Sequence, residues 1–509
     1  MKINIYATSD VHGHIYPYDY AANCSLNHSL AHIYSCYEED KTEYKLIVDN
    51  GDIIQGNFAE LFIDEVPNPV VNVMNNMNYS IWNMGNHEFN FSFPKLKKII
   101  SNFNGTALMA NSNSAFFNKY KTVKIGGIKI SFIGINTVLI NEFEKEESLA
   151  GLVIENPVPI LNKLIKELAN ESDILIGMFH MGLQDENSVP NSGLYSVLDN
   201  INSPQLFDVI VCGHTHKDIE ELFYKNILIT ETSAYANTVS KIELEFDEKK
   251  LINKNSKLVD LSNFNPSEKI LKLYEPYHKK ILEYTNETIG YVSGIVGNFN
   301  YDLEDNPLNH LLTEIMLQNS KADVVAFQID NKNAVLKNGP LKRYNMAKLY
   351  SYDGGEVTSY KITGLDLKTY IIWSYDYFDY SEDTNSISVN EKRALFKYKT
   401  LDVFGNINYA IDLKKQGQHR LIELKYLNGI DVLDSDEIII GMNEYRMNFL
   451  ISKKGPLNGK TFDKTASTKY IDKHFHKRGT IRELAEDYFN TLLNKTYIYD
   501  NKVNFLIKY

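Results

Sequence analysis

Cysteine is scarce in this sequence, which has three among its 509 residues. Cys24, Cys36 and Cys212 are too few and too scattered to form a disulfide framework or a thiolate metal site. No run of about 18 apolar residues occurs, which excludes a helix long enough to cross a membrane. The chain begins with a short strand-like run and lacks the long apolar core of a signal peptide. We therefore expect a cytoplasmic protein with no membrane partner.

Basic residues are fewer than acidic ones, since the chain has 53 Lys and Arg and 65 Asp and Glu, which gives a net charge of −12. Binding to a nucleic-acid polymer requires a basic face, so we expect no such partner. A small anionic substrate would need a local source of positive charge, which bound metal ions could supply. The length exceeds what one hydrophobic core usually serves and predicts two domains. The oligomeric state is left open.

Five short apolar runs punctuate the first half of the chain, and each is followed by polar residues. They lie at 3–6, 45–48, 81–84, 174–179 and 209–212 and are rich in Ile, Val or Phe. Runs of this length and composition predict buried strands. Functional groups gather at the carboxyl ends of strands in such sheets, so the five segments predict one shared site.

The residues that follow these runs are of the types that bind metal ions. They are Asp10, His12, Asp52, Asn86, His180, His214 and His216. Side chains alternate along an extended segment, so Asp10 and His12 should share one side, as should His214 and His216. Carboxylate, imidazole and amide ligands favour Mn, Zn or Fe over Mg or Ca. With one bridging carboxylate, seven ligands suffice for two divalent metal ions about 3.5–4 Å apart. A single histidine after a strand is more often structural, so the ordered set carries the prediction.

The second half has a different organisation. Apolar spacing between 267 and 284 predicts a helix that joins the domains, with a kink at Pro276. Strand-like and helical segments then follow in irregular order, which predicts an α+β domain. We expect a first domain at 1–262, a linker helix at 263–285 and a second domain at 286–509.

The ordered motifs of the first half resemble those of the calcineurin-like metallophosphoesterases. They read Asp10-x-His12, Gly51-Asp52, Gly85-Asn86-His87-Glu88, His180 and Gly213-His214-x-His216. The resemblance implies an α/β fold, a four-layer αββα sandwich. It also implies the ligand sets: Asp10, His12 and His216 for one ion, Asn86, His180 and His214 for the other, and Asp52 as the bridge.

Short motifs of the second half resemble the C-terminal domain of the 5′-nucleotidase family. They are Asn338-Gly339-Pro340-Leu341, Tyr352-Asp353, Ile362-Thr363-Gly364, Tyr409-Ala410-Ile411-Asp412-Leu413 and Asn443-Glu444-Tyr445-Arg446. In that family the domain binds the nucleoside and holds the base between two aromatic rings. The resemblance implies that Tyr445 is one ring and that Tyr398 or Phe404 is the other. Arg446 could contact phosphate or the ribose side, and a surface salt bridge is an equal alternative.

Asn90 indicates which branch of the family the chain resembles, because the 5′-nucleotidases usually have Asp at this position. Asn90, together with Tyr18-Asp19-Tyr20 and Glu186-Asn187, resembles the 2′,3′-cyclic-nucleotide phosphodiesterase branch. The expected function is therefore hydrolysis of 2′,3′-cyclic nucleotides and 3′-nucleotides by a hydroxide that two metal ions activate. A departure is Met447-Asn448-Phe449-Leu450, where that branch usually has a glycine-rich run, and these bulky residues would reshape the base pocket.

His87 adjoins the ligand Asn86 but lies outside the ligand set. We expect it to stabilise charge on the phosphoryl group or to protonate the leaving oxygen. Asn90 could orient His87 by a hydrogen bond, although it would raise the pKa of His87 less than an Asp would. One alternative is a 5′-nucleotidase or nucleotide-sugar hydrolase. The other is a non-catalytic nucleotide-binding protein on the same scaffold.

Overall fold

A computed structural model gives the fold of the chain as two compact units, which are Met1–Leu282 and Glu283–Tyr509. The residues that it describes are 1–144, 146–186, 189–297, 303–328, 335–349, 356–394, 401–471, 477–499 and 503–509. The predicted connecting helix is present as α8 (Glu268–Asn286), with Pro276 inside it, and the unit boundary falls within this helix. The predicted domain limits at 262 and 285 stay predictions.

Unit 1 contains two six-stranded sheets, each with parallel strands at its centre; antiparallel strands lie at one edge of the first sheet and at both edges of the second. Across the first sheet the order is β14 (Lys250–Asp260), β13 (Thr238–Asp247), β1 (Lys2–Thr8), β4 (Tyr44–Asp49), β5 (Ile81–Asn83) and β6 (Thr106–Leu108). Across the second it is β11 (Ile219–Tyr224), β12 (Ile227–Glu231), β10 (Val209–Cys212), β9 (Ile174–His180), β8 (Ile128–Asn136) and β7 (Tyr120–Ile125). The five predicted strands are thus confirmed as β1, β4, β5, β9 and β10.

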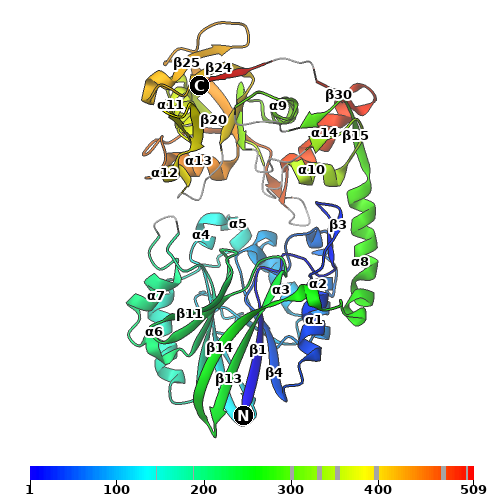
Figure 1. The fold of residues 1–509 in the computed structure, drawn as a ribbon, viewed down its shortest axis with the longest axis vertical. Coiled ribbons are helices and arrows are strands. Elements are labelled where there is room, and N and C mark those ends of the chain that lie inside the picture. The colour runs from blue at the N-terminus through cyan, green and yellow to red at the C-terminus, as the bar shows by residue number, and fades with distance from the viewer. Residues whose placement is uncertain are drawn as a thin grey trace. The chain divides into compact units, whose positions relative to one another are not determined.

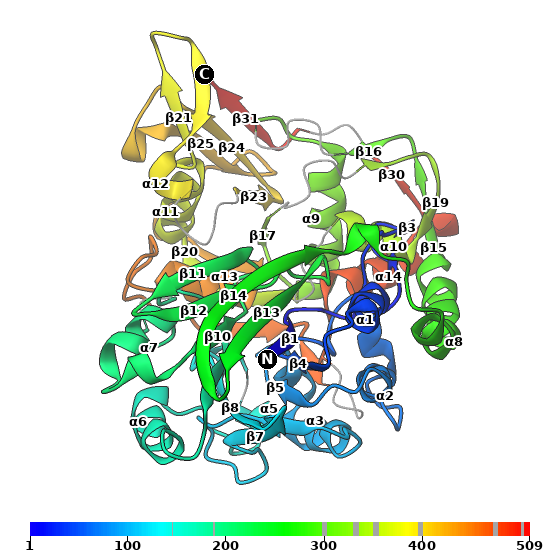
Figure 2. The ribbon, with the colours of Figure 1, turned by 60° about the horizontal axis from the view of Figure 1, so that its bottom comes forward.

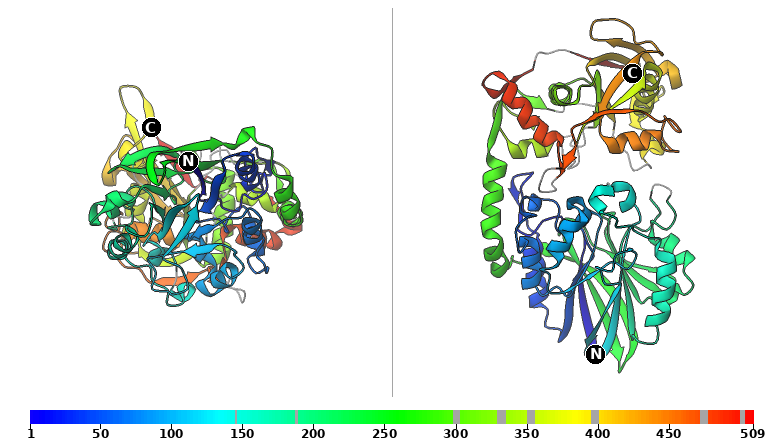
Figure 3. Two further views of the ribbon diagram at one scale, coloured as in Figure 1. Left: turned by 90° about the horizontal axis from the view of Figure 1, so that it is seen from below. Right: turned by 180° about the vertical axis from the view of Figure 1, so that it is seen from behind.

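Helices cover the outer faces of both sheets (Figures 1 and 2). The helices beside the first sheet are α1 (Leu30–Glu39), α2 (Pro69–Asn76) and α3 (Phe93–Ile100), and those beside the second are α6 (Pro157–Leu168) and α7 (Leu194–Asn200). The view from behind in Figure 3 shows the strands between the two sets of helices. This is the predicted four-layer αββα sandwich, and it is confirmed.

The central strands β9, β10 and β12 are buried along their whole length, as strands covered on both faces of a sheet are. On β1, Ile3 and Ile5 belong to the apolar cluster between the sheets, whereas Tyr6 belongs to the cluster beneath α1 and α2. All seven residues of β9 are buried. Because β1, β4 and β5 run parallel, as do β9 and β10, the strands of each sheet end at one edge.

Asparagine followed by proline begins three of the helices. In α2, α6 and α9 (Pro307–Ser320) the preceding Asn side chain accepts hydrogen bonds from backbone N–H groups of the first turn, and Pro occupies the first helical position. Both choices suit a helix start, because the side chain satisfies N–H groups that lack a helical partner and Pro has none to satisfy.

Unit 2 is the predicted α+β domain, built around one apolar core. Its largest sheet has the order β23 (Asp402–Gly405), β17 (Val324–Gln328), β26 (Glu437–Met442), β20 (Thr358–Thr363) and β27 (Lys464–Ser467). Two three-stranded sheets have the orders β19 (Gly339–Lys342), β15 (Thr288–Ser293), β30 (Thr496–Ile498) and β25 (Leu421–Tyr426), β24 (Ile407–Asp412), β31 (Phe505–Lys508). The main helices are α9, α10 (Arg343–Leu349), α11 (Gly364–Tyr375), α13 (Glu444–Ile451) and α14 (Ile481–Thr491). Within the parts of the chain that the structure describes, no helix combines the length and the apolar character needed to cross a membrane.

Candidate metal centre

Three side chains of the predicted first ligand set lie together in unit 1. Asp10 follows β1, His12 lies two residues further on, and His216 follows β10. The Nε2 atoms of His12 and His216 are 3.2 Å apart, and Asp10 Oδ1 is 3.4 Å from His216 Nε2. Two imidazole nitrogens about 2.0–2.1 Å from one tetrahedral ion would be roughly 3.3 Å apart. The spacing therefore fits a shared cation.

The second predicted set forms a neighbouring group. Asn86 Oδ1 lies 2.7 Å from His214 Nδ1 and 3.1 Å from His180 Nε2. Asp52 Oδ2 lies 3.1 Å from the same His180 nitrogen. Asp52 is 1% exposed and His180 is wholly buried. His180 Nε2 is also 3.9 Å from Asp10 Oδ1, so the two groups adjoin.

The histidines hold one ring nitrogen toward the cluster by using the other nitrogen elsewhere. His180 Nδ1 donates to the backbone carbonyl of Asn50 at 2.7 Å, which leaves Nε2 for the site. His12 Nδ1 lies 3.0 Å from the Gln55 side-chain oxygen, and His214 Nε2 lies 3.1 Å from Glu186 Oε1. An oxygen partner of this kind fixes the tautomer and the ring orientation of a metal-binding histidine.

Left-handed backbone, not strand alternation, brings these side chains together. Five of the seven have a positive φ: Asp10 (55°), His12 (46°), Asp52 (59°), His214 (72°) and His216 (55°). The expectation that an extended segment would align His214 with His216 is therefore wrong, since the two rings face different groups. Such backbone is costly for residues other than glycine and clusters at functional sites, where the surrounding structure enforces it.

Glu88 connects the two turns that carry Asp52 and Asn86 by hydrogen bonds, a role that the sequence motif did not reveal. Its wholly buried carboxylate accepts hydrogen bonds from the backbone N–H groups of Asp52 (2.8 Å), Ile53 (2.9 Å) and Gly85 (2.7 Å). Gly85 is required at its position because a Cβ there would lie 2.2 Å from Asp52 Oδ1. The turn after β4 and the turn after β5 are thus locked together.

The charges of the cluster also suit cations. Burial raises the pKa of a carboxyl, yet the charge of His180 and a hydrogen bond with His216 outweigh burial and lower the pKa of Asp10 to about 2. Burial lowers the pKa of His180, but the Asp52 and Asp10 carboxylates prevail and raise it to about 10. Within the described residues, the ion pairs of Asp10 and Asp52 are all with histidines. Two buried carboxylates beside imidazole and amide donors fit divalent transition-metal ions.

His87 and Asn90 lie beside the ligands, in the turn that follows β5. The His87 backbone N–H donates to Asp52 Oδ1 at 2.7 Å, and its ring lies edge-on to that of His12 with centroids 5.3 Å apart. His87 Nδ1 is 2.8 Å from Asn90 Oδ1. His87 and Asn90 are both half-buried.

The predicted base-binding residues lie in unit 2, and those that the structure describes differ in how deeply they are buried. Tyr445 is half-buried in the first turn of α13. Arg446, the next residue, is 2% exposed and forms an ion pair with Asp402 at 2.9 Å. The expected salt bridge is therefore present, but it is buried and does not lie on the surface. Phe404 is 1% exposed and packs edge-on against Tyr370 and Tyr409 in the core.

A second ring for the nucleobase is therefore not identified. Phe404 offers almost no surface to a ligand, because core side chains surround it, and we propose no base contact for it. Tyr398 lies outside the described residues, as do Asn187 and the Tyr352-Asp353 pair.

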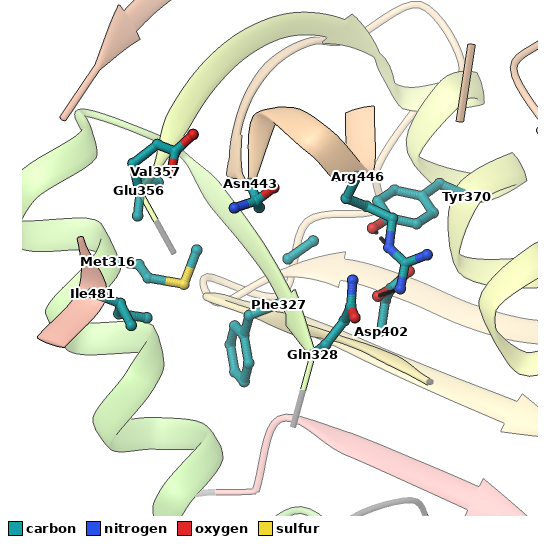
Figure 4. Close-up of a pocket in the computed structure, with 11 residues that line it drawn as sticks. Met316, Phe327, Gln328, Glu356, Val357, Tyr370, Asp402, Asn443, Arg446 and Ile481 are labelled. Carbon is teal, nitrogen blue, oxygen red and sulfur yellow. Dashed lines mark hydrogen bonds and ion pairs between the residues drawn. The ribbon is translucent and has the colours of Figure 1, made fainter. Parts of the chain in front are cut away.

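Arg446 lines a pocket of unit 2 (Figure 4). Its guanidinium lies beside Asp402 and Tyr370. Asn443, which caps the N-terminus of α13, also lines the pocket. The other lining residues are Met316, Ala326, Phe327, Gln328, Glu356, Val357 and Ile481. Tyr445 is not among the described residues that line it.

Two sequence families match the chain, one in each unit. Residues 3–218 match the calcineurin-like phosphoesterases, the class that the sandwich and its strand-end Asp and His residues define. Residues 288–449 match the 5′-nucleotidase C-terminal domain. The chain belongs to the calcineurin-like phosphoesterases that carry a 5′-nucleotidase C-terminal domain. The family expected from the sequence motifs is thereby confirmed.

Individual relatives are distant. The chain is 22% identical over 527 residues to the trifunctional nucleotide phosphoesterase protein YfkN of Bacillus subtilis, covering 88% of this chain and 36% of YfkN, about a third of its length. It is 24% identical over 535 residues to the 2′,3′-cyclic-nucleotide 2′-phosphodiesterase/3′-nucleotidase of Haemophilus influenzae, covering 88% and 80%. A Staphylococcus aureus crystal structure, assigned as a 5′-nucleotidase, covers 100% of both chains with a TM-score of 0.82 and 22% identity, which shows the shared fold.

Proposed function

We propose that this protein is a phosphoesterase that hydrolyses nucleotide phosphoesters with two divalent metal ions. Asp10, His12 and His216 would hold one ion, Asn86, His180 and His214 the other, and Asp52 would bridge them. The observation that carries the proposal is the pair of adjoining Asp/His groups whose ligand atoms lie within 4.8 Å of one another in each group. The metal identity, Mn, Zn or Fe, is left to experiment.

A bound pair of divalent ions supplies binding for phosphate oxygens and lowers the pKa of water toward neutrality. The chain's own residues supply orientation and proton transfer. Asp10 and Asp52 place two buried carboxylates at the strand ends, and carboxylate oxygens favour the binding of cations there. His87, half-buried beside the ligands, would protonate the leaving oxygen or stabilise charge on the phosphoryl group.

We propose 2′,3′-cyclic nucleotides and 3′-nucleotides as the substrates. Asn90 supports this choice, because it contacts His87 where the 5′-nucleotidases usually have Asp. The strained ring of a cyclic diester has a better leaving group and needs less help from an acid. The Haemophilus relative with that named activity supports it as well. A 5′-nucleotidase or nucleotide-sugar hydrolase is the alternative, and a non-catalytic nucleotide-binding protein is the second.

Unit 2 would bind the nucleoside. Tyr445 remains the proposed stacking ring, since it is half-buried next to Arg446, and a ring stacked on a base contributes about 1–3 kcal/mol. Arg446 is held by Asp402, and one guanidinium can form hydrogen bonds to more than one acceptor. We therefore propose that Arg446 shapes the nucleoside pocket while it is paired, rather than acting as a free phosphate ligand.

The role of His87 is tested by His87→Ala. We expect turnover to fall by about 10²-fold or more, the range for general acid–base groups, while metal content stays near two ions per chain. Turnover and metal content would be measured on the same preparation, with 3′-AMP as substrate, because its ribose leaving oxygen needs a proton. Full activity with both ions present would refute the assignment of His87.

The substrate class is tested with a panel of 2′,3′-cyclic AMP, 3′-AMP, 5′-AMP and a nucleotide sugar, with Mn added. We expect the highest kcat/KM for 2′,3′-cyclic AMP. A preference for 5′-AMP would support the 5′-nucleotidase alternative, and neither metal nor turnover would support the binding protein.

A further inference from the structure

A buried carboxylate stands behind the pair formed by His87 and Asn90. Glu144 directly follows the short helix α4 (Ile140–Phe143) and is 8% exposed. Asn90 Nδ2 donates to Glu144 Oε1 at 2.7 Å, while Asn90 Oδ1 lies 2.8 Å from His87 Nδ1. The three side chains thus form a continuous series from a carboxylate through an amide to an imidazole.

The chemistry of the three groups determines which way the amide of Asn90 faces. Glu144 Oε1 accepts the hydrogen bond from Asn90 Nδ2, so the NH₂ group of Asn90 faces Glu144. The amide oxygen then faces His87, where it accepts a hydrogen bond from Nδ1–H. Glu144 accepts from the amide NH₂ of Asn90, which turns the amide oxygen toward His87. This oxygen can only accept, so the proton of the second hydrogen bond must be on His87 Nδ1.

The orientation matters for any acid role of His87. A protonated imidazole carries hydrogen on both nitrogens, so a proton donor at Nε2 requires a partner at Nδ1 that accepts. If Asn90 were reversed, its NH₂ group would face Nδ1 and oppose the proton there. Two donors would then face each other, so this arrangement would disfavour a hydrogen on both ring nitrogens and make Nε2 a poorer proton donor.

We propose that Glu144 is a positioning residue, which fixes the amide of Asn90 and thereby keeps a proton on His87 Nδ1. This inference rests on the proposed function of His87. In the step concerned, the oxygen of a water molecule bonds to phosphorus and that water gives up a proton to solvent. As the bond between phosphorus and the leaving oxygen breaks, the leaving oxygen takes the proton from Nε2. His87 is left neutral, with its proton on Nδ1.

A reciprocal exchange of amide and carboxylate tests the proposal. Glu144→Gln preserves the shape of the side chain but can present either oxygen or NH₂, so the orientation of Asn90 is released. Asn90→Asp alone puts a carboxylate against Glu144 at a contact of 2.7 Å, which like charges oppose. The double variant Asn90→Asp/Glu144→Gln restores an acceptor facing His87 and a donor facing that acceptor.

We expect Glu144→Gln to lower kcat roughly tenfold, as loss of a supporting hydrogen bond behind a catalytic group does, with KM within about twofold. Asn90→Asp alone should lose activity, and the double variant should return to within about threefold of the parent. Glu142→Gln is the matched control, because Glu142 lies two residues before Glu144, in α4, and is exposed. Equal activity of Glu144→Gln and the parent, or a double variant no better than Asn90→Asp, would overturn the proposal.

A second readout does not depend on turnover. The full chain labelled with ¹⁵N-histidine, with and without Zn, would report the protonation of each ring nitrogen, and His87 is identified by the signal lost in His87→Ala. We expect a protonated Nδ1 in the parent and the double variant, and a shift toward the Nε2-protonated form in Glu144→Gln. An unchanged Nδ1 signal in Glu144→Gln would overturn the proposal even if activity fell. If His87→Ala keeps full turnover, the proposed function of His87 fails instead.

Discussion

Asp52 shows at the scale of one residue how the two ligand groups depend on each other. Its Oδ1 accepts the backbone N–H of His87 at 2.7 Å, and its Oδ2 lies 3.1 Å from His180 Nε2. An Asn at this position would replace one oxygen with NH₂, which cannot bind a cation. We expect Asp52→Asn to lose both ions, from about two per chain to well below one, as measured by elemental analysis of purified protein.

The control for that variant is Asp199→Asn, since Asp199 lies on the exposed surface beside Lys225. It should keep the metal content and the activity of the parent. Two ions per chain in Asp52→Asn would show that Asp52 does not bridge them.

At this scale the sequence allows the ligand types to be predicted more readily than their geometry. The ligands follow apolar runs, and that order is visible along the chain. The left-handed turns at Asp10 and His214 are not visible, because the φ values there are imposed by neighbouring segments. Glu88 and Glu144 act through contacts with residues at other places in the chain, so no spacing rule could reveal their roles.

At the scale of elements, the turn after β5 is held close to the turn after β4. A Cβ on Gly85 would lie 2.2 Å from Asp52 Oδ1 and 2.5 Å from Asp52 N, closer than any real side chain allows. We expect Gly85→Ala to separate the two turns, to lower metal content and to destabilise the fold by several kcal/mol, a large effect for one substitution. Urea unfolding and elemental analysis would measure both results.

The matched glycine is Gly127, between β7 and β8, where an added Cβ would meet nothing within 4 Å. Its φ of +86° means that Gly127→Ala should cost about 1–2 kcal/mol from backbone strain alone, with no loss of metal. Equal effects of the two substitutions would show that the contact with Asp52 is not the cause.

The elements themselves were predicted where burial is complete. Strands β1, β9 and β10 are hydrophobic on both faces, and that pattern is simple to recognise. The choice of Phe404 as a base-stacking ring in unit 2 is wrong because all four residues of β23 are buried, so neither face of this strand offers a ring to a ligand. A wholly buried ring and a ligand-facing ring have the same sequence signature.

At the scale of the whole molecule, the unfolding of each unit can be followed separately by fluorescence, because each unit contains one of the two tryptophans. Trp82 lies in unit 1 and is wholly buried, and Trp373 lies in α11 of unit 2. Ligands stabilise the unit that binds them, by about 2.7 kcal/mol when their concentration is 100 times Kd. In Trp373→Phe, which retains Trp82, we expect a chelator to lower the fluorescence unfolding temperature.

The complementary variant is Trp82→Phe, in which Trp373 reports on unit 2. Its unfolding temperature should be insensitive to the chelator, since the predicted ligands all lie in unit 1. An equal shift in both variants would contradict the assignment of the metal site to unit 1, or show that the units unfold together.

The hydrogen bond between His180 Nδ1 and the Asn50 carbonyl has a consequence for how this site tolerates mutation. The acceptor is a main-chain atom, so no side-chain substitution at position 50 deletes it. His214 depends instead on the side chain of Glu186, which one nucleotide change can remove. Random mutagenesis of the partner positions should therefore disable His214 far more often than His180. Within this one ligand group, random mutation would therefore weaken the position of His214 before that of His180.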